Sequence, residues 1–313
     1  MLVITLGDPW SVNIEIISQC LSGSFLENCH RRNIPVTLIG SFYHWEQQSG
    51  KNLDVEFTPV DLTKEMMVPA DKLSVESRGN IALQSLQKVV QINANRLAVL
   101  TMPIDKHACW KAGFDFPGQT EFFEKIWQTA GLMLLAGPKL RVGLVTTHIP
   151  LSRVAQTISA ELIESKIHLM FTSLKNNFQI NKPRLAVTGL NPHCGDQGMF
   201  GSEDQTIITK VIKNLKKRYG DNLTGPLPAD TVFYHAYQGM YDGVLAMYHD
   251  QGLGPLKTVH FDSAINISAG LPHLRVSPDH GPAKDLFMQN KASLISTQEA
   301  LNVCLNYLMM TGQ

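Results

Sequence analysis

The sequence has no excess of charge of either sign and few cysteines. Its 313 residues include 27 Lys or Arg and 27 Asp or Glu, which gives a formal net charge of zero and a pI of about 7.2. This balance provides no overall electrostatic footprint for binding nucleic acid or an anionic membrane. The five cysteines are scattered, odd in number and never spaced as Cys-x-x-Cys. We therefore expect a reducing compartment, and neither a disulfide framework nor a cysteine zinc site.

Long apolar runs are also missing. The segment Gly131–Ala136 is apolar but far shorter than the roughly 20 residues that a membrane-spanning helix needs. The first six residues, Met1–Leu6, lack a basic region and are too short to form the apolar core of a signal peptide. We therefore expect a soluble, cytoplasmic protein.

Several common catalytic motifs are absent from the sequence. It contains no Gly-x-Gly-x-x-Gly after its first strand-like segment, no Walker A sequence, no Gly-x-Ser-x-Gly and no His-Glu-x-x-His. These absences disfavour an ordinary Rossmann dehydrogenase, a P-loop enzyme and an α/β-hydrolase. If the protein binds a dinucleotide, a motif other than the glycine fingerprint must bind it.

The composition and the order of the segments predict an α/β protein with two domains. Hydrophobic residues make up 44% of the chain and charged residues 17%, which is typical of a well-buried globular enzyme. At this length a single core usually stops growing, so two domains are expected. Strand-like runs such as Leu2–Leu6, Val36–Ile39 and Leu97–Leu100 alternate with helical segments, which predicts a largely parallel sheet. We also expect capping boxes at Ser202–Gln205 and Ser296–Glu299 to start helices.

Three further strand-like runs each end a few residues before a histidine. The pairs are Val142–Val145 with His148, Leu185–Val187 with His193, and Val244–Met247 with His249. The third run lies in Gly243–Lys257, the stretch around which we expect the chain to be organised. Its glycines Gly252 and Gly254 predict a loop after the strand. In open α/β sheets, ligands bind at the carboxyl ends of the strands.

Two interpretations of these histidines stay open on the pattern alone. Three imidazoles converging from neighbouring strand ends would form an open metal site with positions free for water or substrate. Each could instead be an ordinary loop histidine held by hydrogen bonds. The segment Pro117–Glu121 has the same ambiguity, because it predicts either an anion site at a helix N-terminus or a simple threonine cap.

The longest motifs resemble one family of enzymes over nearly the whole chain. They are Thr146–Leu151, Gly189–His193, Gly225–Thr231 and Ala246–Gly252. They resemble the 4-hydroxythreonine-4-phosphate dehydrogenase family of vitamin B6 (pyridoxine 5'-phosphate) biosynthesis, in the isocitrate/isopropylmalate dehydrogenase-like superfamily. The resemblance implies two α/β/α domains with the active site in the cleft between them, at the interface of a homodimer. It also implies an outer, cofactor-binding domain of residues 1–115 plus 270–313. Residues 116–269 would form an inner domain with the metal ligands and the dimer interface.

The resemblance also assigns roles to single residues. It implies that His148, His193 and His249 bind a divalent metal in a site that both chains of the dimer share. The positions that match substrate-binding residues of the family are Gln119, Thr120, Lys257, Asn266 and Arg275. The residues Asp279, His280 and Gly281 begin a loop that resembles the adenosine-binding loop of the superfamily.

The activity implied is the oxidation of 4-phosphooxy-L-threonine with NAD or NADP and one divalent metal ion (zinc, cobalt, magnesium or manganese) per active site. The product, 2-amino-3-oxo-4-(phosphooxy)butanoate, would lose carbon dioxide and give 3-amino-2-oxopropyl phosphate. Lys257 and Arg275 suit a carboxylate or phosphate by their charge. We expect Lys257 and Asp230 to be the catalytic side chains. Asp230 would remove a proton or orient a ligand, and a structural role is its alternative.

Three departures from the family motifs bear on the substrate. The family has Gly-His-Thr-Glu where this chain has Gly118–Glu121, and the glutamine at 119 cannot carry a proton at neutral pH. The loop Pro9–Glu15 lacks two glycines of the family and contains Trp10. The segment Leu286–Asn290 replaces further glycines. These changes keep two alternatives open: a paralogue that oxidises a threonate or erythronate 4-phosphate, and a catalytically idle metal-binding dimer.

Overall fold

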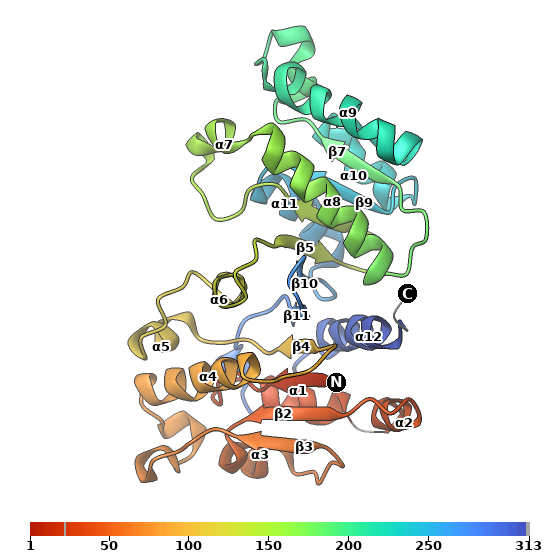
Figure 1. The fold of residues 1–313 in the computed structure, drawn as a ribbon. Coiled ribbons are helices and arrows are strands. Elements are labelled where there is room, and N and C mark those ends of the chain that lie inside the picture. The colour runs from red at the N-terminus through yellow and green to blue at the C-terminus, as the bar shows by residue number, and fades with distance from the viewer. Residues whose placement is uncertain (22, 311–313) are drawn as a thin grey trace. The chain divides into compact units, whose positions relative to one another are not determined.

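The computed structural model describes residues 1–21 and 23–310, and it divides into two compact units (Figure 1). The first unit is Met1–Thr129 with Leu271–Gln313, and the second is Ala130–Gly270. The chain therefore passes between the units after Thr129 and after Gly270, where the sequence analysis placed boundaries after residues 115 and 269. The roles predicted for the two domains stay predictions.

The first unit contains five parallel strands in the order β3-β2-β1-β4-β11. These are β1 Leu2–Thr5, β2 Val36–Gly40, β3 Glu56–Pro59, β4 Ala98–Thr101 and β11 Leu274–Pro278. The helices are α1 Asn13–Cys20, α2 Ser24–Arg31, α3 Phe42–Ser49, α4 Val75–Val90, α5 Lys106–Lys111, α6 Gln119–Ile126 and α12 Ile295–Met309, with short turns η1 Lys64–Met66, η2 Ala70–Lys72 and η6 Lys284–Leu286.

Apolar strands form the centre of this unit. Every residue of β1 is buried, and Val3 lies in register with Thr37 of β2 and Val99 of β4. A run that is apolar on both faces suits a parallel sheet covered by helices. The last helix, α12, packs on β11, β4 and β1, so the blue C-terminal helix lies against two strands from the first third of the chain, β1 and β4 (Figure 1).

The second unit contains six strands in the order β10-β5-β6-β9-β7-β8. These are β5 Leu132–Ala136, β6 Arg141–Leu144, β7 Leu185–Thr188, β8 Leu223–Leu227, β9 Gly243–Ala246 and β10 Ile265–Ala269. The helices are α7 Leu151–Thr157, α8 Ala160–Asn176, α9 Thr209–Tyr219, α10 Ala229–Tyr237 and α11 His249–His260, with short turns η3 Pro192–Gly198, η4 Asp204–Ile208 and η5 Gly220–Asn222.

Strand β5 is the reversed strand of this unit. It runs antiparallel to β6 and to β10, whereas β6, β9, β7 and β8 pair in parallel. A tight turn joins β5 to β6, closed by the hydrogen bond from the Gly137 N–H to the Leu140 carbonyl (2.9 Å). Strands joined by so short a turn can only be antiparallel. The predicted α/β class with largely parallel strands is confirmed.

The loop predicted after the third histidine run is wrong. Helix α11 begins at His249 and continues through Gly252, Gly254 and Pro255. At Gly252, a Cβ atom would come within 2.7 Å of the Val142 side chain and 2.9 Å of the Leu144 side chain. This glycine therefore allows the helix to pack closely on the sheet, and it does not mark a flexible segment.

Neither predicted capping box has its capping bond. The helix predicted after the first box does begin there, because the π-helical segment η4 continues into α9, but its N-cap residue is Glu203 and no side chain caps it. Helix α12 begins at Ile295, and the Ser296 hydroxyl accepts a hydrogen bond from the Asp279 N–H at 3.1 Å instead. In the second case a tertiary partner holds the hydroxyl that the local pattern assigned to the cap.

No helix within the described residues is both long enough and apolar enough to span a bilayer.

Candidate metal centre and substrate cluster

The three histidine-bearing segments leave the sheet of the second unit at one edge. Strands β6, β9 and β7 are neighbours and run parallel, so their carboxyl ends lie together. The segments that follow carry His148, His249 and His193 in that order. This confirms that the three predicted runs are strands. It also places their ends where α/β proteins bind ligands.

A chain of hydrogen bonds ties these strand ends together. Thr146 donates twice to the Met247 carbonyl, from its N–H at 3.2 Å and from its hydroxyl at 2.8 Å. Thr146 is nearly fully buried, and Met247 is fully buried. The bonds fix the end of β6 against the end of β9, two residues before His148 and two residues before His249.

Gln251 extends this chain to the end of β7. Its Oε1 accepts the Met247 N–H at 2.7 Å and the Thr188 hydroxyl at 2.8 Å, and its Nε2 donates to the Gly189 carbonyl at 2.8 Å. One side chain in the first turn of α11 thus joins the ends of β9 and β7. Gln251 belongs to one of the motifs of the sequence, but the pattern assigns it no role. Its position four residues after Met247, in a helical first turn, is the signal that could have found it.

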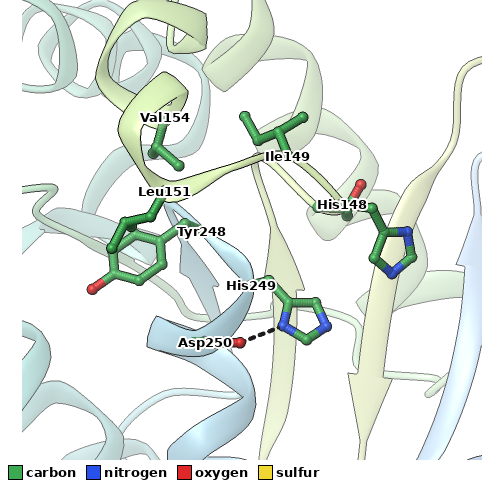
Figure 2. Close-up of a pocket in the computed structure, with 8 residues that line it drawn as sticks. His148, Ile149, Leu151, Val154, Tyr248, His249 and Asp250 are labelled. Carbon is green, nitrogen blue, oxygen red and sulfur yellow. Dashed lines mark hydrogen bonds and ion pairs between the residues drawn. The ribbon is translucent and has the colours of Figure 1, made fainter.

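His148 and His249 lie next to each other in the lining of a pocket of about 260 Å³ (Figure 2). Their ring centroids are 5.7 Å apart. Thr147, Ile149, Leu151, Val154, Tyr248 and Asp250 complete the lining. Asp250 Oδ1 lies 2.6 Å from His249 Nδ1, so the carboxylate orients the ring and leaves Nε2 directed away from it.

His193 lies elsewhere on the same edge, in a left-handed turn. The residues His193, Cys194, Asp196 and Gln197 have φ values of 52°, 56°, 38° and 57°. Non-glycine residues in this region cost about 1–2 kcal/mol each, so the surroundings must hold them there. His193 is exposed, and its ring centroid is 6.5 Å from that of the partly exposed Phe200.

A buried carboxylate, Asp204, holds the start of this turn. It is fully buried, and its oxygens accept the N–H groups of Leu190 (2.8 Å) and Asn191 (3.1 Å). The Asn191 side-chain amide adds a third hydrogen bond at 3.0 Å. Asp204 therefore fixes the backbone that leads into His193. The sequence analysis missed this residue, because its partners lie 13 and 14 positions away and no local pattern marks them.

The donors in this region fit a divalent metal in part. Two imidazoles that lie next to each other, one of them oriented by a carboxylate, are a common part of such sites. A metal ion about 2.1 Å from a nitrogen of each ring is compatible with the 5.7 Å separation of the centroids. In residues 1–21 and 23–310, no group of three or more His, Cys, Asp or Glu side chains is placed to hold a metal ion. One chain therefore brings together two of the three predicted ligands, and His193 stays a predicted ligand.

A second cluster, in the first unit, surrounds Arg275. Its guanidinium donates to the Thr101 hydroxyl from Nε (3.0 Å) and NH2 (2.6 Å), and to the Thr120 hydroxyl from NH1 (3.2 Å). Burial lowers the pKa of Arg275 to about 10, although the charge of Glu121 acts in the opposite direction. Arg275 is therefore a rigid, buried cation. The Gln119 amide donates to the Met102 carbonyl at 3.2 Å, and its Oε1 is buried without a hydrogen-bond partner among the described residues.

The remaining predicted residues of the second unit are spread over its elements. Lys257, in α11, is partly buried, with its ammonium 5.8 Å from the centroid of the Phe261 ring. The Asn266 Oδ1, on β10, is buried and accepts no hydrogen bond within the described part of the chain. Asp230 is exposed in the first turn of α10. None of the three lines the pocket of His148 and His249.

The predicted cofactor residues follow β11. Burial lowers the pKa of His280, whose Nδ1 lies 2.9 Å from the Gly281 carbonyl. Its Nε2 is buried with no hydrogen-bond partner among the residues described, which suits a polar group of a bound ligand. Asp279 is anchored at its N–H by the Ser296 hydroxyl. The buried His280 Nε2 is therefore the feature of this loop that suits a bound dinucleotide.

Trp10 lies between two cations beside this loop. The Arg78 guanidinium is 4.9 Å from its ring centroid, and the Lys284 ammonium is 5.0 Å from it. Arg78 also pairs with the buried Asp8 at 3.0 Å, and Lys284 pairs with Asp105. Burial raises the pKa of Asp8 to about 6, against the opposing effect of Arg78. Trp10 therefore connects the loop Pro9–Glu15 to η6 through a charged network.

Comparisons with known proteins agree on one family. A family model described as pyridoxal phosphate biosynthetic protein PdxA matches residues 21–304. A 4-hydroxythreonine-4-phosphate dehydrogenase from Bradyrhizobium diazoefficiens is 42% identical over 255 residues, covering 79% of this chain and 74% of that protein. The crystal structure of a 4-hydroxythreonine-4-phosphate dehydrogenase from Klebsiella pneumoniae matches with a TM-score of 0.80 and 30% identity, covering 98% of this chain and 99% of that chain.

A more distant match bears on the fold alone. An isocitrate dehydrogenase from Methylococcus capsulatus matches with a TM-score of 0.55 and 10% identity, covering 98% of this chain and 85% of that chain. The predicted isocitrate/isopropylmalate dehydrogenase-like fold is therefore confirmed.

Proposed function

Because the chain belongs to the family of the pyridoxal phosphate biosynthetic protein PdxA, we propose that it oxidises 4-phosphooxy-L-threonine with NAD or NADP and a divalent metal ion. The family predicted from the motifs is confirmed, and so is the prediction that the protein is an enzyme of the dehydrogenase class. The product would be 2-amino-3-oxo-4-(phosphooxy)butanoate, a β-keto acid. Such acids lose carbon dioxide readily, which gives 3-amino-2-oxopropyl phosphate.

The observation that carries the proposal is the His148–His249 pocket at the tied strand ends. The two ring centroids are 5.7 Å apart, and the hydrogen bonds from Thr146 to the Met247 carbonyl tie together the strand ends that precede them. A bound divalent ion would polarise the substrate hydroxyl and lower its pKa. His148 and His249 would hold this ion, with Asp250 keeping the His249 ring in place. The cofactor would supply the hydride acceptor, and Asp279, His280 and Gly281 would bind it.

The other predicted residues would bind the substrate and move a proton. Arg275, buried and already fixed by two threonines, would hold a phosphate or carboxylate in a two-pronged hydrogen bond. Thr120, Gln119 and Asn266 would add neutral hydrogen bonds. Lys257 would neutralise the second acidic group of the substrate and contact the hydroxyl that is oxidised. Asp230, exposed at the start of α10, would accept the proton that leaves.

We propose that a second copy of the chain completes the metal site, so that the active enzyme is a homodimer. Each chain brings two histidines together and presents His193 on an exposed turn. Large apolar side chains are exposed around this region: Leu151 at 70%, Met199 at 74% and Phe200 at 47%. Exposed apolar side chains of this size favour a protein interface. We further propose a cytoplasmic location, as expected for an enzyme of vitamin B6 biosynthesis.

Gln119 favours a second candidate substrate. Where the family motif has a histidine, this amide donates to the Met102 carbonyl and cannot carry a proton at neutral pH. A substrate without the amino group, such as a threonate or erythronate 4-phosphate, would need no proton acceptor at this position. The chain would then be a paralogue with the same metal and cofactor chemistry.

The test is NAD or NADP reduction by the purified protein, with and without a chelator. The wells contain 4-phosphooxy-L-threonine, threonate 4-phosphate or erythronate 4-phosphate. Chelator-sensitive turnover of phosphooxy-threonine, restored by zinc, cobalt, magnesium or manganese, is the expected result. Turnover of a sugar-acid phosphate alone would replace the leading substrate with the second candidate. Metal binding without turnover of any of the three would leave the idle metal-binding dimer.

A further inference from the structure

A hollow of about 370 Å³ lies at the opposite edge of the second unit's sheet from the histidines. Residues of this hollow come just before β7 and β8, whose amino ends share one edge because the two strands are parallel. The histidine-bearing segments follow the carboxyl ends of the same sheet. The lining residues are Phe171, Thr172, Lys175, Asn181, Lys182, Pro183, Arg218, Tyr219 and Asn222. The hollow is therefore separate from the His148–His249 pocket.

The charged residues that line this hollow have one sign. Lys175, Lys182 and Arg218 are its three cations, and no lining residue is acidic. Asp221 neighbours Asn222 in the chain but does not line the hollow. In the part of the chain that the structure describes, none of the three cations forms an ion pair with a carboxylate. The chain as a whole has no net charge, so this local surplus is not a consequence of composition.

The C-terminal ends of α8 and α9 offset only part of this surplus of positive charge. Lys175 lies in the last turn of α8 and Arg218 in the last turn of α9, where cations offset the helix dipole. Each helix C-terminus carries the equivalent of about half a negative charge. Two such ends offset about one of the three positive charges. Roughly two remain, which equals the charge of a phosphate monoester above its second pKa of about 6.

Two stacked aromatic rings form part of the wall of the hollow, and neutral polar side chains complete it. Phe171 and Tyr219 stack with centroids 3.8 Å apart and an interplanar angle of 5°, which joins α8 to the end of α9. The Tyr219 hydroxyl lies 2.5 Å from His168 Nδ1 and is held by it. Thr172, Asn181 and Asn222 add an alcohol and two amides to the lining. A site whose charged groups are all cations, and which adds neutral hydrogen-bond donors, favours an anion that accepts hydrogen bonds.

We propose that this hollow binds a small phosphate ester at a second site, distinct from the candidate active site. Lys175, Lys182 and Arg218 would contact the phosphate, and the amides would contact the rest of the molecule. The volume exceeds that of a bare phosphate ion, which favours an ester over inorganic phosphate. The proposal does not depend on the substrate proposed above, because no residue of the hollow belongs to the metal or substrate clusters.

The first measurement is lysine footprinting of the whole protein by acetylation and mass spectrometry. The probes are glycerol 3-phosphate and inorganic phosphate, with chloride at matched ionic strength. We expect glycerol 3-phosphate to slow the labelling of Lys175 and Lys182 and to leave Lys210 and Lys213 unchanged. Both controls are exposed on α9 and do not line the hollow. Equal labelling with and without the ester, or equal protection by chloride, would refute the site.

The second measurement is calorimetric titration of the two probes into variants of the whole protein. The double variant K182Q/R218Q should weaken binding of glycerol 3-phosphate at this site at least about tenfold, because charge-assisted hydrogen bonds are lost. The matched control K210Q/K213Q removes the same charge from α9 and should bind as the unmodified protein does. Equal weakening in both variants would mean that general surface charge holds the anion, and the proposal would fail. Tighter binding of inorganic phosphate than of the ester would show that the ion alone is the ligand, which would also contradict it.

Discussion

Replacing Gln251 with leucine removes the side chain that joins the ends of β9 and β7, while keeping a helix-forming residue of similar size. The variant leaves the buried Met247 N–H and the buried Gly189 carbonyl without their hydrogen bonds of 2.7 and 2.8 Å. The Thr188 hydroxyl loses a third bond at 2.8 Å. Each buried polar group left unpaired costs about 1–3 kcal/mol. We therefore expect the free energy of unfolding to fall by about 2–5 kcal/mol.

Two assays check this expectation. Urea denaturation followed by circular dichroism should show a lower midpoint with an unchanged slope. Hydrogen exchange should show faster exchange of the Met247 amide, because its acceptor is gone. Gln238→Leu is the matched control, because this glutamine is exposed at the end of α10 in the same unit and should change neither measurement. Unchanged stability and unchanged Met247 exchange in Gln251→Leu would refute the role given to this residue.

Three other changes test the surrounding groups. Asp204→Ala should lower the free energy of unfolding by about 2–5 kcal/mol in urea titrations, because two backbone N–H groups lose their acceptor. The control Asp262→Ala changes an exposed aspartate and should leave the free energy of unfolding unchanged. Equal effects of the two changes would contradict the role given to Asp204. The folded-state pKa of Asp8 is raised from 3.8 to about 6, so the folded state binds more protons between these values. This group should therefore cost about 2 kcal/mol of stability as pH rises from 4 to 6. Stability curves of Asp8→Asn should lack this decline, and an identical pH slope in both proteins would count against it. Arg275→Lys should reduce kcat/KM for the phosphorylated substrate about tenfold to a hundredfold, because an ammonium cannot reproduce the guanidinium fork; unchanged kinetics would exclude a contact with substrate.

The strands and the edge that carries the histidines were predictable from the sequence. A run such as Leu2–Thr5, apolar except for Thr5, is buried on both faces of a parallel sheet, and this requirement is local to the run. Parallel strands then place their carboxyl ends together, so the segments with His148 and His249 had to be neighbours once their strands paired.

The roles of Gln251 and Asp204 were not predictable, because their partners come from other parts of the chain. Gln251 satisfies groups more than 60 residues away, and no spacing rule marks such a contact. The left-handed turn at His193 was not predictable for the same reason, because it depends on residues elsewhere in the chain. A non-glycine residue adopts this conformation only where the fold compensates, and here the buried Asp204 fixes the preceding backbone.

Helix α11 shows where local propensity failed. Two glycines and a proline within Gly252–Pro255 predict a break, since these residues are poor helix formers. The sheet underneath leaves no room for a side chain at Gly252, so the glycine is retained for packing. The cost of the glycine is then offset by contact with β6.

The most direct test of the proposed metal centre is complementation between two inactive variants. His193→Ala and His249→Ala should each lose metal-dependent NAD reduction on 4-phosphooxy-L-threonine when purified alone. After the two are unfolded together and refolded, mixed dimers should recover activity, up to about a quarter of that of the unmodified enzyme. This recovery would arise because each mixed dimer has one site with all three histidines intact when the ligands come from both chains. No recovery, with mixed dimers confirmed by mass spectrometry, would contradict a metal centre completed by a second copy of the chain.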